Sequence, residues 1–212
     1  MGNAPVPPDR PPDWDADSPQ LHANLRRVEQ QVREDATRPL LELGAALALH
    51  WQTQMMRDLH TEKPEFVGCF RGSSDATNRN AVVGSRRGSP FARVKHELDA
   101  FDLALQERVS LLDEALDESG GKLDAEFLES VIQVCTWAHG EWVRIHPFGN
   151  GNGRTARMWA NLVAQRYGFP AFIFTRPRPG DGYGAIGAAA MDGNWRAAVP
   201  LFRTLMAEAL SL

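Results

Sequence analysis

The segment His146-Pro-Phe-Gly-Asn-Gly-Asn-Gly-Arg-Thr-Ala-Arg157 is the most informative part of this chain, for its fold and for its chemistry. Its three alternating glycines free the backbone to turn N–H groups toward one anion. Arg154 and Arg157 are three residues apart, so they share a face on the first turn of the helix that we predict to follow. The positive end of that helix dipole lies at the same place, and His146 can accept a proton near neutral pH. An anion cradle, a cationic clamp and an adjacent base together indicate phosphoryl or nucleotidyl transfer.

The segment resembles the signature of the Fic family, also called Fic/Doc or Fido, which reads His-Pro-Phe-x-(Asp/Glu)-Gly-Asn-Gly-(Arg/Lys)-x-x-Arg. Every fixed position matches except one, where Asn150 replaces the acid that binds a metal ion in the family. The resemblance covers roughly residues 20–212, and His146–Arg157 is its diagnostic part. It implies an all-α, mainly helical fold with one short β-hairpin flap.

The resemblance also implies a role for each residue of the signature. His146 would be the general base that removes a proton from a Ser, Thr or Tyr hydroxyl of a target protein. That hydroxyl would attack a phosphorus atom of ATP or another nucleoside triphosphate, which leaves AMP or another nucleotide on the target. Arg154 and Arg157 would hold the β- and γ-phosphates. The other phosphate-binding positions would be Gly149, Gly151, Asn152 and Gly153.

The replacement of the acid by Asn150 changes the expected metal chemistry. A carboxylate is a hard, charged ligand for Mg²⁺, whereas an amide carbonyl is neutral and weaker. We consider three consequences, in decreasing order of preference. Mg²⁺ or Mn²⁺ still binds through Asn150, water and the phosphates, which gives a slower AMP transferase. Alternatively, the nucleotide takes another pose or the enzyme uses another donor, as in phosphotransfer. In the third case, the domain binds nucleotide without turnover and serves as an interaction module.

A short segment upstream of the signature predicts the hairpin. Ala81-Val82-Val83-Gly84 is a β-prone run that ends in turn residues. Fic proteins carry a flap in this region that pairs with the backbone of the target. The resemblance therefore makes Val82, Val83 and Gly84 candidate docking residues. Downstream, Arg176, Arg178 and Tyr183 resemble family positions near the adenosine pocket.

The sequence gives one candidate for self-inhibition. Many Fic proteins carry an inhibitory helix, Ser/Thr-x-x-x-Glu-Gly/Asn, whose glutamate pairs with the second arginine of the signature. Thr204 and Glu208 have this spacing on a predicted C-terminal helix, but Ala209 replaces the Gly or Asn. The same loose spacing occurs twice elsewhere in the chain, so the match is a common one. A separate antitoxin chain, or no inhibitor at all, is the alternative.

Composition places the chain among ordinary globular domains. Its 212 residues suffice for one sizeable core, and a net charge of −4 predicts neither a nucleic-acid partner nor an acidic membrane surface. Two cysteines indicate no disulfide framework. We find no apolar run of membrane-spanning length and no signal peptide. These observations favour the cytoplasm, with export as an effector without a cleaved signal as the alternative.

Periodicity and helix-breaking residues divide the chain further. Residues 1–19 are rich in proline and predict an extended or disordered arm, followed by a single domain over residues 20–212. Pro39 marks a break in a helical region, and Asp124 is placed to cap a later helix. The predicted helical segments are about 21–60 with the break at Pro39, 90–116, 124–145, 155–167, 183–191 and 200–212.

Overall fold

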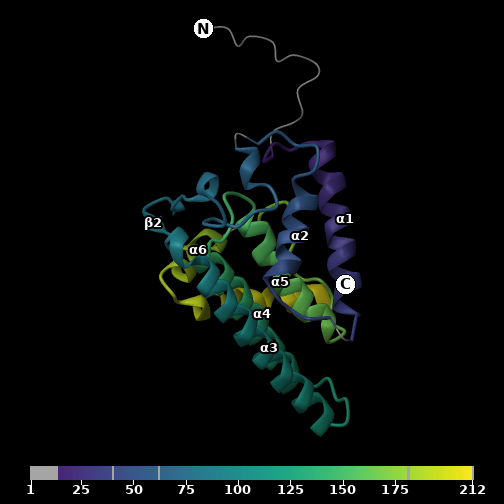
Figure 1. Cartoon of the computed structure of the whole chain (residues 1–212). Helices are drawn as coiled ribbons and strands as arrows, with labels where there is room; N and C mark the ends of the chain where they lie inside the picture. Colours follow the sequence, from purple (N-terminus) through teal and green to yellow (C-terminus); the bar gives the residue numbers. More distant parts are fainter. Residues whose placement is uncertain (1–13, 40, 62, 181, 212) are drawn as a thin grey trace.

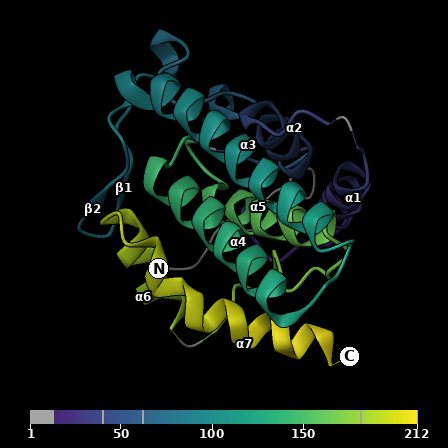
Figure 2. The ribbon, with the colours of Figure 1, turned by 90° about the horizontal axis from the view of Figure 1, so that it is seen from below.

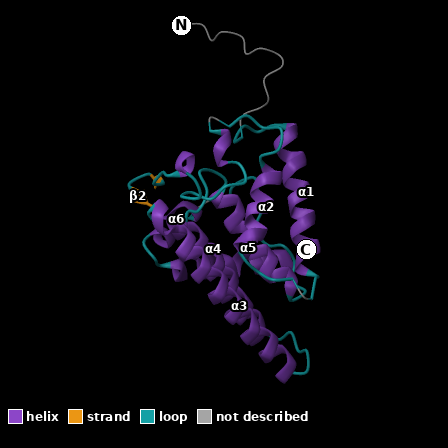
Figure 3. Cartoon of the chain, viewed as in Figure 1, coloured by secondary structure: helices purple, strands orange, loops and turns teal. Residues whose placement is uncertain are grey.

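The computed structural model describes residues 14–39, 41–61, 63–180 and 182–211. Over these residues the fold is mainly helical, with one two-stranded antiparallel sheet (Figures 1 and 3). This confirms the predicted all-α architecture with a single hairpin. The helices are α1 (Pro19–Ala36), α2 (Ala45–Met55), α3 (Val94–Glu118), α4 (Ala125–Ile145), α5 (Asn152–Arg166), α6 (Tyr183–Met191) and α7 (Val199–Leu210).

Helices α4 and α5 form the centre of the molecule, and the signature loop joins them. In Figure 2, α3 and α7 flank α4 on opposite sides, while α1 and α2 lie beside α5. The indole N–H of the buried Trp142 on α4 donates to the hydroxyl of Thr155 on α5, at 2.8 Å. The rings of Trp142 and Trp159 lie 5.7 Å apart, and Phe101 from α3 packs edge-on against both. Burying each such ring contributes about 2–3 kcal/mol, so the two central helices are held firmly on either side of the loop.

The helix boundaries follow local signals in most places. The carboxylate of Asp124 accepts hydrogen bonds from the N–H groups of Glu126 and Phe127, which confirms it as the N-cap of α4. α5 differs, because it begins at Asn152 rather than at the predicted residue 155. The reason is that Gly151, with φ 85°, already makes the turn into the helix, so the last glycine of the signature lies inside α5.

The hairpin forms where the sequence predicts it. Strands β1 (Val82–Val83) and β2 (Arg86–Arg87) pair antiparallel, with Val82 opposite Arg87 and Val83 opposite Arg86. Gly84 takes φ 61° in the two-residue turn, a conformation that glycine adopts without strain. Val82 and Val83 are 64% and 45% exposed. The hairpin therefore presents an apolar strand to its surroundings.

The N-terminal arm falls largely outside the described residues, since residues 1–13 are not described. Its last residues contact the domain. The N–H of Trp14 donates to the carbonyl of His60 at 2.9 Å, and Ser18 caps the start of α1. Among the helices of the described ranges, none has both the length and the apolar composition needed to cross a bilayer.

Candidate active site

The signature loop begins with a sharp change in backbone direction. α4 ends at Ile145, and His146 takes the left-handed conformation, with φ 54° and ψ 55°. For a residue other than glycine this conformation costs about 1–2 kcal/mol. The cost is offset nearby, because Phe148 is fully buried and its ring stacks on Phe70 with a centroid distance of 5.1 Å. Phe148 thus anchors the loop on which His146 is carried.

The side-chain amide of Asn152 also stabilises this loop. Its side-chain oxygen accepts a hydrogen bond from the N–H of Phe148 at 2.8 Å, and its side-chain nitrogen donates to the carbonyl of Phe148 at 2.9 Å. The amide is buried and bonded at both ends. These two bonds fix the side chain within the loop and use one of the two hydrogens of Nδ2. The direct contact with phosphate that the sequence suggests stays a prediction.

Two of the signature glycines are required, for different reasons. A Cβ atom on Gly149 would lie 2.5 Å from the ring of Phe66, whereas Gly151 has a φ of 85°, which residues other than glycine rarely adopt. No described side chain caps the N-terminus of α5. The first N–H groups of this helix are therefore left for a ligand, together with the positive end of the helix dipole.

Arg154 and Arg157 are buried at this helix terminus, with only 6% and 5% exposure. Arg157 donates to the carbonyl of Thr175 at 2.7 Å and to the hydroxyl of Tyr183 at 3.1 Å. Arg154 pairs with the carboxylate of Asp15. Burial lowers the pKa of Arg154 to about 10, so it remains a cation at neutral pH. Cations at a helix N-terminus are unfavourable unless an anion compensates them.

These groups open into a cleft of about 660 Å³ between the signature loop, the hairpin and α6. Its size suits a small-molecule ligand of nucleotide dimensions. Asp15 is the only acidic residue among the described residues that line it, so the charged side chains of the lining are mainly positive. The cationic residues that line it are Arg86, Arg154, Arg157, Arg176 and Arg178, and Tyr183 lies beside them.

His146 is held in one tautomer at the edge of this cleft. Its Nδ1 lies 3.3 Å from the carbonyl of Val143, and a carbonyl can only accept, so Nδ1 carries the hydrogen. Nε2 is then left with its lone pair as a proton acceptor. Burial lowers the pKa of His146 to about 4, and the nearby cation Arg71 acts in the same direction. The imidazole is therefore neutral and able to act as a base at pH 7.

Two residues of the site gave little or no signal in the sequence. Arg71 is 2% exposed and donates to the carbonyls of Ile145, His146 and Ser89, all within 3.0 Å. It thereby ties the base of the hairpin to the loop. His139 is 1% exposed and its Nε2 lies 2.7 Å from the hydroxyl of Tyr183.

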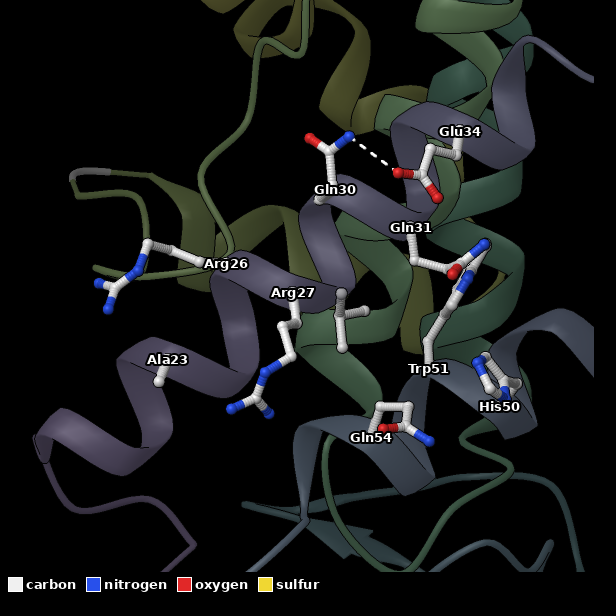
Figure 4. Close-up of a pocket in the computed structure, with 10 residues that line it drawn as sticks. Ala23, Arg26, Arg27, Gln30, Gln31, Glu34, His50, Trp51 and Gln54 are labelled. Atoms are coloured by element: carbon white, nitrogen blue, oxygen red, sulfur yellow. Dashed lines mark hydrogen bonds between the residues drawn. The ribbon is translucent and has the colours of Figure 1, made fainter.

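Two other cavities and the predicted inhibitory residue differ in how they lie relative to this cleft. A smaller cavity of about 330 Å³ lies beneath the hairpin and shares His146 and Asn150 with the main cleft. A groove of about 580 Å³ between α1 and α2, shown in Figure 4, contains polar residues such as Gln30 and Glu34 but no residue of the signature. Glu208 is exposed on α7 and is not among the residues that line the cleft.

Parts of this chain are similar in sequence to curated proteins. The chain is 38% identical over 72 residues to the protein adenylyltransferase fic-1 of Caenorhabditis briggsae. It is 50% identical over 42 residues to protein adenylyltransferase fic-1 of Caenorhabditis elegans. These alignments cover 34% and 20% of this chain but only 13% and 8% of the relatives. The chain therefore matches a small part of each of these longer proteins.

A solved structure matches over most of the chain. It is a Fic domain containing signaling protein from Bacteroides thetaiotaomicron, with a TM-score of 0.65 and 17% identity. The match covers 91% of this chain and 70% of that one, and at this identity it shows the shared fold alone. Residues 40–164, which include α2 to most of α5, match the Fic/DOC family as a whole. Because this match spans more than half of the sequence and the fold agrees with it, the chain belongs to the Fic/DOC family.

Proposed function

We propose that this chain is a protein nucleotidyltransferase that moves AMP, or another nucleoside monophosphate, from a nucleoside triphosphate to a hydroxyl of a target protein. One observation carries the proposal. The neutral base His146 lies where the arginine-lined cleft meets the smaller cavity under the hairpin. A donor in the first cavity and a hydroxyl in the second would meet at its Nε2. Relatives named protein adenylyltransferases support the same reaction class.

In the proposed transfer, each bond that forms is matched by one that breaks, and His146 accepts the proton. Nε2 of His146 takes the hydroxyl proton, and the oxygen forms a bond to the α-phosphorus. The bond from that phosphorus to the bridging oxygen of the β-phosphate breaks, and pyrophosphate leaves. Arg154 and Arg157, together with the N-terminus of α5, would neutralise the charge that develops on the leaving group. The proton on His146 then passes to water or to pyrophosphate.

The hairpin would present the target. Its strand β1 is short, exposed and apolar at Val82 and Val83, and it borders both cavities. An extended segment of a target protein can add to such a strand through main-chain hydrogen bonds. This arrangement would bring a Ser, Thr or Tyr side chain of the target toward His146.

Transfer of label from ATP tests the proposal. A cell lysate receives wild-type protein, or the His146→Ala variant, with ATP labelled at the α- or at the γ-phosphate. We expect protein-bound label from the α-position with wild type only. The exposed His96→Ala variant serves as the matched control and should label as wild type does.

Two results would contradict the proposal. Label from the γ-position alone would mean phosphotransfer on the same scaffold. Absence of any label that depends on His146 would mean another donor or a nucleotide-binding module without turnover.

A further inference from the structure

The side chain of Gln52 has a fixed orientation beneath the signature loop. It is fully buried on α2, and its Oε1 accepts a hydrogen bond from the N–H of Gly68 at 2.7 Å. Its Nε2 donates to the carbonyl of Phe66 at 3.3 Å. A rotated amide would place a donor against the N–H of Gly68 and an acceptor against the carbonyl of Phe66. These two backbone groups therefore determine which end of Gln52 faces the loop.

Gln52 in turn orients the residue that replaces the family's acid. Its Nε2 also donates to Oδ1 of Asn150, at 3.2 Å. Rotation of Asn150 would set two donors against each other, so the oxygen points to Gln52. Nδ2 has no hydrogen-bond partner among the described residues, and Asn150 lines both cavities. The polar group that Asn150 leaves for a ligand is thus an N–H donor.

An acid at this position would behave differently. A carboxylate could also accept the hydrogen bond from Gln52 through one oxygen and would keep its second oxygen for a cation. The amide has a donor in that place, and a donor does not coordinate a metal ion. The oxygen of Asn150 is already bonded to Gln52, and Asp15, the one described carboxylate that lines the cleft, is paired with Arg154, so the side chains of this site offer no free carboxylate to a Mg²⁺ ion.

Arginine side chains can neutralise the negative charge of a triphosphate in place of a metal ion. Five arginines line the cleft, and Arg154 and Arg157 are buried in it. Planar guanidinium groups bind phosphate oxygens in pairs of hydrogen bonds. We propose that Asn150 donates a hydrogen bond to a phosphate oxygen of the donor and that this cleft binds nucleoside triphosphate without a divalent cation. The inference rests on the proposed nucleotide site and removes the metal from it.

Binding of α,β-methylene-ATP, whose α–β link cannot be cleaved, tests this by titration calorimetry in EDTA and in excess Mg²⁺. For wild type we expect affinities that differ by less than threefold, or tighter binding in EDTA. For Asn150→Asp we expect at least tenfold weaker binding in EDTA, because the carboxylate faces phosphate, with recovery in Mg²⁺. Asn150→Ala removes the donor without adding a charge and should weaken binding at least threefold in both buffers. Asn194→Asp adds the same charge at an exposed position away from the cleft and should match wild type.

The outcomes separate the two proposals. If wild type binds more than threefold more weakly in EDTA than in Mg²⁺, the inference is wrong and the nucleotidyltransferase proposal stands. If Asn150→Ala binds as wild type does in both buffers, the donor role of Asn150 is wrong. Absence of binding by folded wild-type protein in both buffers would overturn the nucleotide site itself, and the inference with it. Thermal unfolding of each variant checks that a loss of binding is not a loss of folding.

Discussion

His146 combines a strained backbone with a side chain whose proton is assigned by its surroundings. The left-handed backbone turns the chain at the end of α4, and the carbonyl of Val143 holds Nδ1. Most histidines at pH 7 need only a small change in surroundings to gain a proton. Burial lowers the pKa of His146, so an unprotonated imidazole is available over a wide pH range. This availability comes at a cost in intrinsic basicity, since a low pKa means a weaker base.

The first prediction concerns the pH dependence of transfer. Because burial lowers the pKa of His146 to about 4, its neutral form persists well below the ordinary histidine range. We expect kcat/KM for target labelling to keep its value from pH 7 down to about pH 5 and to fall with a midpoint near pH 4. Initial rates in short assays measure this before acid unfolding intervenes. A midpoint near 6.5 would show that the imidazole is solvated.

The second prediction concerns Asp15, which pairs with Arg154 and lies 3.4 Å from Arg176. Its carboxylate neutralises the guanidinium group of Arg154, which an anionic ligand would otherwise bind. Asp15 is 60% exposed, and exposed pairs contribute at most about 1 kcal/mol. We therefore expect Asp15→Asn to bind α,β-methylene-ATP about two- to fivefold more tightly at low salt. Asp17→Asn is the control, because Asp17 reaches Arg176 but not Arg154. Weaker binding by Asp15→Asn would mean that Asp15 positions Arg154 for the ligand.

At the scale of elements, Arg71 joins the hairpin to the end of α4. Its guanidinium donates to two carbonyls at the helix end, Ile145 and His146, and to Ser89 and Arg79 in the hairpin segment. All four partners are backbone groups, and buried carbonyls without donors destabilise a fold. The hairpin and the signature loop are thus supported by the same side chain.

The third prediction follows from this joint support. Replacing Arg71 by Met removes a donor from all four carbonyls, and only that of Ile145 keeps another described donor, the N–H of Ser89 at 3.2 Å. We expect the free energy of unfolding to fall by about 2–4 kcal/mol. Removing the cation should also move the acid midpoint of kcat/KM upward, because Arg71 helps to lower the pKa of His146. Arg71→Lys should restore part of both effects. A stability loss with an unchanged midpoint would limit Arg71 to a structural role.

The elements also show what local sequence signals can and cannot predict. Asp124 and the Ala81–Gly84 run were read correctly, because a cap and a turn depend on a few neighbouring residues. The start of α5 lies earlier than predicted, because Gly151 already makes the turn and Gly153 lies in the first turn of the helix. The contact between Gln52 and Asn150 joins residues 98 positions apart in the sequence. Glutamine and asparagine are common polar residues, so their identity alone does not predict that they pair. The contacts of Arg71 cannot be predicted from the sequence either, because its partners are backbone carbonyls, which every residue type has.

For the molecule as a whole, the core around α4 and α5 contains buried groups that titrate. His139 is 1% exposed, and burial together with the charge of Arg157 lowers its pKa to about 3. In the unfolded chain a histidine titrates near 6.5. Between these two values the unfolded state binds more protons than the folded state. The contribution of His139 to stability is therefore complete above about pH 6.5 and declines as the pH falls toward 3.

The fourth prediction isolates this effect. The free energy of unfolding, measured in urea between pH 6 and pH 4, should fall less steeply for His139→Gln than for wild type. The difference in slope should approach about 1.4 kcal/mol per pH unit, the value for one proton. The comparison of slopes is insensitive to any constant loss of stability in the variant. Equal slopes would show that His139 titrates in the folded protein as it does in the unfolded chain.

The position of Trp14 gives the protein an optical reporter of its own cleft. Its ring lies 5.2 Å from the guanidinium carbon of Arg154, and of the six tryptophans, all within the described residues, Trp14 alone lines the cleft. A ligand that draws Arg154 away from this ring should change the tryptophan emission without any label. The change should saturate during titration with α,β-methylene-ATP and disappear in Trp14→Phe. A change that survives this substitution would come from a tryptophan of the core and would report a wider rearrangement on binding.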